Sequence, residues 1–544
     1  MATLFGSPAF AKRSDDAEML KKYVEARLAE SNGRPADAAV IYAETLKKQP
    51  DNLLLASKTY VKAIESGDFH LAFKAVRALE LGGAVDPEMP LLLFADAFAR
   101  KDYKAAELAS LELKAREHLA FLTPLLNAWI ANASGKSPVK ELSLANKDKN
   151  GAYYHQEQLI LHALAGGYEA DVMQLIDALI DRREPRMAPL RILIARHFLA
   201  IGNEEQAQKI LQHKVTGSET RMFREVQAGN THGLAQKADA MTGAAFLLQR
   251  LAADLGAQRA YFSGLVIAQA AANISPDNDY GRHVLADAYG NIKNSAAAIA
   301  ELKKIPDNSI YALQAINMEI ARYIETKNYT AGHKRMEETI ALHPDIPELR
   351  ALSGQLFQVS GNNKAAAKAY EDAIILAEKR NLSDRVLASY WLALGGAQEQ
   401  AGLWPKGLES LKKANALLPK SASILNYLGY AQLERRENTK AAIAAIRKAY
   451  KLRPSSPAIT DSLGWAYYIT GEYEKAVDYL ELARAGEPHD PTINEHLGDA
   501  YWAVGRKYEA RYAWKSAKLF ADITGAERLT DKIDLGLRAN LVSP

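Results

Sequence analysis

Two histidines and two acidic residues lie close together in the segment EPHDPTINEHLGD, where the residue types alone could bind a metal ion or transfer a proton. They are His489, Asp490, Glu495 and His496. A zinc site needs its ligands to converge on one point. We expect His489 in a turn between helices and His496 in the helix that follows, and this spacing does not make them converge. The sequence therefore predicts structural roles for these residues and no metal site.

Other patterns that carry chemistry are missing from the sequence. The chain has no cysteine, which removes thiolate zinc sites and cysteine nucleophiles. It also has no P-loop, no Gly-x-Ser-x-Gly and no His-Glu-x-x-His. We predict no catalytic residue, no cofactor and no enzyme activity. The alternative is an enzyme whose site is hidden in the irregular N-terminal half, which would need an insert containing strands between about residues 114 and 256; the sequence shows none.

Composition and charge indicate a packed protein without a general affinity for polyanions. Of 544 residues, 48% are hydrophobic, and 68 basic residues nearly balance 65 acidic ones, so nucleic acid is not an expected partner. The sequence contains no run of about 18 apolar residues, so we predict no membrane-spanning helix. In the first 16 residues, Ala9-Phe10-Ala11 resembles a signal-peptidase site, so residues 1–16 are interpreted as a signal-peptide remnant or a disordered N-terminus.

The chain is a repeat array in its C-terminal half. Four glycines within similar helical segments, Gly395, Gly429, Gly464 and Gly498, are 34, 35 and 34 residues apart. Each unit reads as a helix, a turn and a second helix rich in alanine. Prolines follow several units because proline cannot continue a helix; they are Pro419, Pro454 and Pro488. One such pair cannot bury its own apolar face, so the pairs are expected to stack.

The pattern resembles the tetratricopeptide repeat. The unit that opens at Thr460 matches that family's motif through Leu463, Gly464, Tyr467, Ala476, Leu480, Ala483 and Pro488. The resemblance implies an all-α fold of helix-turn-helix repeats stacked in a right-handed superhelical solenoid. We predict degenerate repeats over 17–256, more regular repeats over 257–523, and a capping helix or tail over 524–544. Two polar segments, 131–151 and 213–233, are predicted to be loops or changes of pitch.

The aromatic residues of SLGWAYYITG divide between two faces of one helix. Gly464 and Tyr467 share the motif face, which predicts that Tyr467 is core. Trp465 and Tyr468 fall on the next face, which in tetratricopeptide arrays looks into the concave groove. The predicted partner-binding groove residues are Asn426, Tyr430, Asp461, Trp465, Tyr468, Glu495, Asp499 and Trp502. Acids beside aromatics suit an apolar or basic partner segment. The alternative is that these rings pack against the capping tail or a neighbouring repeat.

A narrower resemblance covers residues 461–517. This stretch is similar to the end of large proteobacterial envelope tetratricopeptide proteins, some of which are lipoproteins that act as adaptors for periplasmic processing proteases. The resemblance implies a non-enzymatic scaffold in the periplasm or envelope, with a protease and its substrates as partners, although this chain has no cysteine to carry a lipid. Alternatives are a structural part of an exopolymer or pilus secretion system, and a cytoplasmic location.

Overall fold

The computed structural model describes residues 8–84, 86–115, 119–182, 184–212 and 216–542. These residues form helices joined by turns and short loops, and no strand occurs among them. They fall into two compact units, unit 1 up to Asn328 and unit 2 from Tyr329 onward. The predicted all-α fold of stacked helix pairs is confirmed. Of the predicted N-terminal segment, residues 1–7 lie outside the described residues, and the first helix begins at Pro8.

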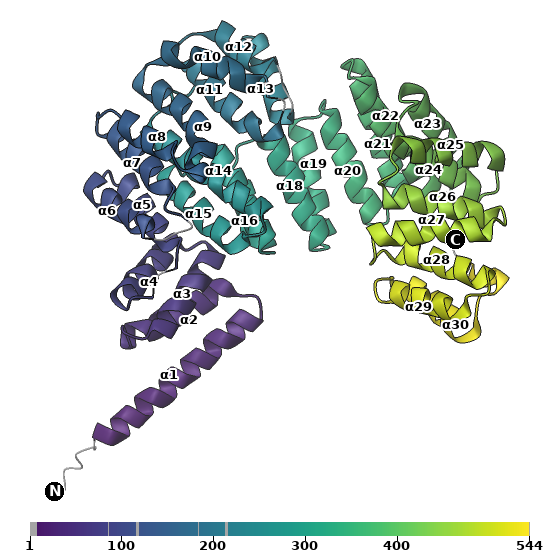
Figure 1. The fold of residues 1–544 in the computed structure, drawn as a ribbon, viewed down its shortest axis with the longest axis horizontal. Coiled ribbons are helices and arrows are strands. Elements are labelled where there is room, and N and C mark those ends of the chain that lie inside the picture. The colour runs from purple at the N-terminus through teal and green to yellow at the C-terminus, as the bar shows by residue number, and fades with distance from the viewer. Residues whose placement is uncertain (1–7, 85, 116–118, 183, 213–215, 543–544) are drawn as a thin grey trace. The chain divides into compact units, whose positions relative to one another are not determined.

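Unit 1 holds the N-terminal helices, drawn from purple to teal in Figure 1. They are α1 (Pro8–Ser31), α2 (Pro35–Lys48), α3 (Leu53–Ser66), α4 (Phe69–Leu81), α5 (Met89–Ala99), α6 (Tyr103–Lys114), α7 (Leu122–Ala133), α8 (Val139–Ala145), α9 (Lys149–Gly166), α10 (Glu169–Ile180), η1 (Pro185–Met187), α11 (Ala188–Ala200), α12 (Glu204–Leu211), α13 (Gly217–Gln227), α14 (Ala240–Ala257), α15 (Tyr261–Ile274), α16 (Asp279–Asn291), α17 (Ser295–Leu302) and α18 (Ala312–Glu325).

Unit 2 is a stack of helix pairs followed by a last helix (Figure 1). Its elements are α19 (Tyr329–Leu342), α20 (Pro347–Val359), α21 (Asn363–Lys379), α22 (Asp384–Gln400), α23 (Trp404–Leu417), α24 (Ala422–Glu434), α25 (Thr439–Leu452), α26 (Pro457–Ile469), α27 (Tyr473–Gly486), α28 (Pro491–Ala503), α29 (Lys507–Lys518), α30 (Ile523–Leu535) and η2 (Ala539–Leu541).

The turns inside the pairs follow from their residue types. Gly67 ends α3 with a positive φ of 83°, a conformation that favours glycine. The Asp68 side chain then accepts a hydrogen bond from the backbone N–H of Leu71 and caps α4. Capping residues of this kind also start helices in segments where loops were predicted. The α8 helix lies within 131–151, and Thr216 and Glu219 form a capping box that starts α13 within 213–233, so a purely loop assignment was wrong for both segments.

The interior of unit 1 is filled by one helix pair of its own. The α14 and α15 helices pack against α7 and α9 and against α3 and α5, respectively. The amide of Gln269 on α15 donates to the carbonyl of Ile64 on α3, 205 positions away, and Ser263 donates to Glu88. Eleven consecutive residues of α14, from Thr242 to Ala252, are buried. Unit 1 therefore departs from an open array, in which each repeat contacts only its neighbours.

Unit 2 keeps the nearest-neighbour stacking that the repeat motif predicts. A Cβ atom placed on Gly464 would lie 2.7 Å from Leu480 Cγ, and one on Gly498 would collide with the ring of Trp514. These glycines let the first helix of a pair approach the second closely, as the motif requires. Successive first helices, α24, α26 and α28, lie against one another and form a layer.

Candidate functional site: the first-helix layer of unit 2

All eight predicted groove residues lie on α24, α26 and α28, so the fold brings them to one layer. Their exposure, however, divides them into two sets. Four are half-buried and reach the surface: Asn426, Tyr430, Tyr468 and Trp502. Four are buried: Asp461, Trp465, Glu495 and Asp499. Each of the buried four has polar partners on neighbouring helices, so these residues join repeats to one another.

Trp465 is a core residue, so the prediction that its ring faces the partner-binding groove was wrong. Its side chain is 1% exposed, whereas Tyr467, predicted to be core, is half-buried. The Trp465 Nε1–H donates to Glu434 at 2.7 Å. One face of the indole stacks on Tyr468, with ring centroids 4.6 Å apart, and the ring also stacks on His496 at 4.1 Å. The alternative of packing against a neighbouring repeat therefore describes Trp465.

Asp461 forms a buried pair with His496 of the next first helix. The His496 Nδ1 lies 3.0 Å from Asp461 Oδ1, and the imidazole is fully buried. Burial alone lowers the pKa of His496, but the charge of Asp461 and the hydrogen bond to it outweigh burial and raise that pKa above its ordinary value. This pair joins α26 to α28.

The His496 pair predicts a pH-dependent stability. Because the pKa of His496 is raised in the folded state, its stabilising contribution is complete below the unfolded pKa of about 6.5 and is lost as pH rises through the folded pKa. We expect the difference in free energy of unfolding between the unmodified chain and His496→Gln to be larger at about pH 6 than at about pH 9. Denaturation measured by circular dichroism at both values tests this. A difference that grows with pH would contradict the assignment.

Glu495 and Asp499 hold the last helix of the chain. Arg528 of α30 donates two hydrogen bonds of 2.8 Å to the Glu495 carboxylate. Lys532, whose side chain is fully buried, donates to Glu495 at 2.7 Å and to Asp499 at 2.8 Å. These cations and the hydrogen bonds they donate help to lower the pKa of Glu495, although burial acts in the opposite direction. The two acids therefore hold one arginine and one lysine of α30, a helix of the same chain that also carries three acidic residues.

The same tail covers the fourth aromatic residue. A Cβ atom placed on Gly536, in the turn after α30, would collide with the Trp502 ring. Trp502 also packs near Trp514, with ring centroids 5.5 Å apart, and under the guanidinium of Arg511. Tyr430 and Tyr468 are the two other predicted aromatics that reach the surface, and partner binding at them remains a prediction.

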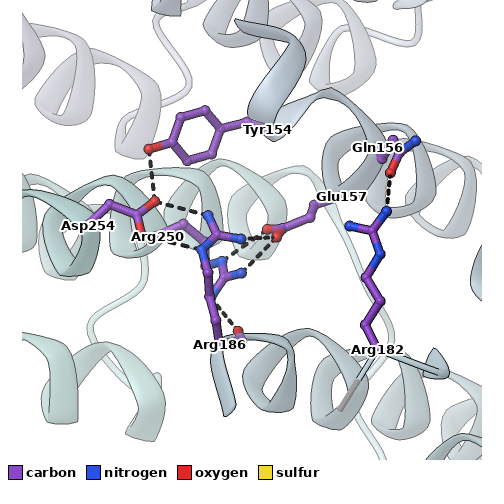
Figure 2. Close-up of polar contacts among 7 residues, drawn as sticks. All are labelled: Tyr154, Gln156, Glu157, Arg182, Arg186, Arg250 and Asp254. Carbon is purple, nitrogen blue, oxygen red and sulfur yellow. Dashed lines mark hydrogen bonds and ion pairs between the residues drawn. The ribbon is translucent and has the colours of Figure 1, made fainter. Parts of the chain in front are cut away.

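A second polar cluster, which sequence analysis did not identify, lies in unit 1. Figure 2 shows Arg186 and Arg250 converging on Glu157, and Arg186 and Tyr154 converging on Asp254. Arg250 holds both oxygens of Glu157, at 2.9 and 2.7 Å. The cluster joins α9, η1 and α14. Glu157 and Arg250, which it brings together, are 93 positions apart in the sequence. Each guanidinium nitrogen of Arg186 and Arg250 donates to an oxygen.

A cavity of about 270 Å³ borders this cluster, with Arg186, Asp254, Tyr261, His283 and Asp287 among its lining residues. His283 is neutral near pH 7, because burial lowers its pKa to about 4. Since the arginines already hold acids of the chain, the arrangement is that of a structural network that fixes α14 inside unit 1. Its residues are too far apart in sequence for a local pattern to reveal them.

No group of three or more histidine, aspartate or glutamate side chains within the described ranges is arranged to hold a metal ion. In the same part of the chain, no helix combines the length and the apolar character needed to cross a bilayer.

Comparison with known proteins identifies the repeat. The tetratricopeptide repeat family model matches residues 392–457. No curated protein matches the chain. Among solved structures, a thermophilic tetratricopeptide protein of Thermus thermophilus is 22% identical, with 34% of this chain and 97% of that chain covered and a TM-score of 0.30.

Two further solved structures are also similar. Yeast Tom70 is 13% identical over 96% of both chains, with a TM-score of 0.39. Pseudomonas aeruginosa PilF is 16% identical, with 41% of this chain and 97% of that chain covered and a TM-score of 0.33. Similarities this low say nothing about function. Residues 392–457 are thus matched as tetratricopeptide repeats, and the described residues form an all-α array of stacked helix pairs, a fold that supports protein–protein interaction.

Proposed function

We propose that the chain is a non-enzymatic adaptor of the bacterial cell envelope that binds basic segments of partner proteins on the first-helix layer of unit 2. The observation that carries this proposal is the hold of Glu495 and Asp499 on Arg528 and Lys532. This contact supports the proposal, because carboxylates on this layer hold basic side chains of a neighbouring helix of the same chain.

The open part of the layer has the same chemistry. Tyr430 and Tyr468 reach the surface there, and the half-buried Glu399 and Glu434 lie near Tyr430. Glu399 already pairs with Arg435, and Glu434 accepts a hydrogen bond from Trp465. Aromatic rings next to carboxylates favour arginine and lysine, through cation–π contacts and charge-assisted hydrogen bonds. In unit 1, by contrast, α14 and α15 fill the space inside the array, so unit 2 is the unit with a first-helix surface for a partner.

Within the envelope, the adaptor would bring a bound substrate to a periplasmic processing protease. This finer role depends on the similarity of residues 461–517 to envelope adaptor proteins. It would place the protease and its substrates on different surfaces of one chain, an arrangement that requires no catalytic group of the adaptor itself.

Site-specific photo-crosslinking in the native host tests the proposal. A photoreactive phenylalanine analogue at position 430 or 468 is expected to capture a partner protein with a basic contact segment. The matched control is position 168, where Tyr168 of unit 1 is 65% exposed. Equal capture from positions 168 and 468, or none from 430 and 468, would contradict binding at this layer. Mass spectrometry of the adduct identifies the partner and whether a protease is among the captured proteins.

A further inference from the structure

The outer edge of the last repeat exposes five large apolar side chains. Tyr508 and Tyr512 lie on α29, Leu519 and Phe520 follow in the turn, and Ile523 begins α30; we call these five residues the α29 edge. Their exposed fractions are 83% for Tyr508, 71% for Tyr512, 79% for Leu519, 51% for Phe520 and 82% for Ile523. Side chains this exposed project from the surface and do not line a hollow.

The repeat fold does not require these residues. The preceding repeat has its equivalent positions 34 residues earlier, the distance between Gly464 and Gly498. There Tyr508, Tyr512 and Leu519 are replaced by Glu474, Asp478 and Ala485, all of which are exposed on α27. At these three positions the preceding repeat thus has two acids and an alanine, and the one large apolar side chain exposed on that face of α27 is Leu482, at 53%. Scattered exposed apolar residues need no explanation, but a contiguous group of this kind marks an interaction surface.

The charges on α29 are mostly basic, whereas two exposed acids, Asp522 and Glu527, flank Ile523 at the start of α30. From Lys507 to Lys518, α29 carries four basic residues and one acid. The acid, Glu509, is paired with Arg506. Lys507, Lys515 and Lys518 are all exposed, and the Lys515 ammonium lies 5.7 Å from the centre of the Tyr512 ring. A projecting apolar row flanked by lysines is the composition of helices that lie at the boundary of an anionic bilayer.

We propose that the α29 edge binds the surface of a membrane that contains anionic phospholipids. Leu519, Phe520 and Ile523 would enter the boundary between headgroups and acyl chains. Tyr508 and Tyr512 suit the interfacial zone, where an amphipathic ring has both an apolar and a wet neighbour. The exposed lysines would lie at the level of the lipid phosphates. A protein partner is less favoured because the exposed side chains of the edge project outward.

Vesicle flotation with the full chain tests the proposal. The unmodified chain should float with vesicles that contain phosphatidylglycerol and remain unbound with vesicles of phosphatidylcholine alone. The variant Tyr508→Glu, Tyr512→Asp, Leu519→Ala installs the side chains of the preceding repeat, so it should fold normally, as an unchanged circular dichroism melting curve would show. Its partition coefficient for the anionic vesicles should fall by about tenfold or more.

A control variant separates edge-specific binding from general stickiness. Leu81, 93% exposed in unit 1, is changed to serine and should leave flotation unaltered. Absence of flotation by the unmodified chain would overturn the proposal, as would equal flotation of the edge variant. Concentration-dependent self-association that the edge variant abolishes, without vesicle binding, would identify the edge as a protein interface and also overturn it.

Discussion

Replacing Trp465 by alanine is expected to lower the free energy of unfolding by about 3–5 kcal/mol, the range for removing a buried tryptophan. The ring is 1% exposed and lies between Tyr468 and His496, so its removal leaves a cavity between α26 and α28. The substitution also removes the hydrogen bond that the indole N–H donates to Glu434. Denaturation followed by circular dichroism, with hydrogen exchange of peptides from α24 to α28, measures the loss.

The matched control is Tyr508→Ala, which removes a side chain that is 83% exposed and should change stability little. A Trp465→Ala variant as stable as this control would mean that the ring is not part of the core. The prediction also limits how partner binding can be tested. Loss of binding in a Trp465→Ala variant would report a disturbed fold, so changes at Tyr430 and Tyr468 are the informative ones.

Replacing Lys532 by methionine is expected to lower the free energy of unfolding by a similar amount, about 3–5 kcal/mol, because the change leaves a buried acid without its cation. Asp499 is fully buried and accepts two hydrogen bonds from the Lys532 ammonium. Glu495 loses one ion pair but remains paired, since Arg528 still donates to both of its oxygens. The free energy of unfolding of the full chain, from denaturant titration, is the measurement.

A second substitution distinguishes loss of an ion pair from loss of packing. The double variant Lys532→Met, Asp499→Asn removes both charges while the asparagine oxygen can still accept from Trp514, so it should regain much of the stability. Lys475→Ala, at an exposed pair with Glu472, should change stability little. If the double variant is no more stable than Lys532→Met alone, the unpaired acid is not the cause.

The helix pairs of unit 2 could be predicted from sequence because each pair depends on residues within one period. Gly464 approaches Leu480 sixteen positions away, and both belong to the same motif. The helical spacing of residues three or four apart also assigned Asp461, Trp465 and Glu495 correctly to one layer. It could not assign their exposure, because the residues that cover them, Glu434, His496 and Lys532, come from other repeats and from the tail.

Unit 1 was less predictable for the same physical reason. The α14 segment AMTGAAFLLQRLAAD is apolar on nearly every face, which is the pattern of a helix buried all round. That pattern predicts burial without naming the neighbours. The contacts that place the α14–α15 pair, such as Arg250 with Glu157 and Gln269 with Ile64, are separated by 93 and 205 positions and leave no trace in a local repeat pattern.

The α14–α15 pair also determines when unit 1 can fold. An array with nearest-neighbour contacts can add one repeat after another as the chain leaves the ribosome. The α14–α15 pair, Ala240–Ile274, is synthesised much later than the helices it contacts, which are α3, α5, α7 and α9. The apolar faces with which these helices contact the pair stay uncovered until it emerges. Closing such long loops slows folding. Unit 1 is therefore a single cooperative body, and fragments that end before α14 lack the centre around which they fold.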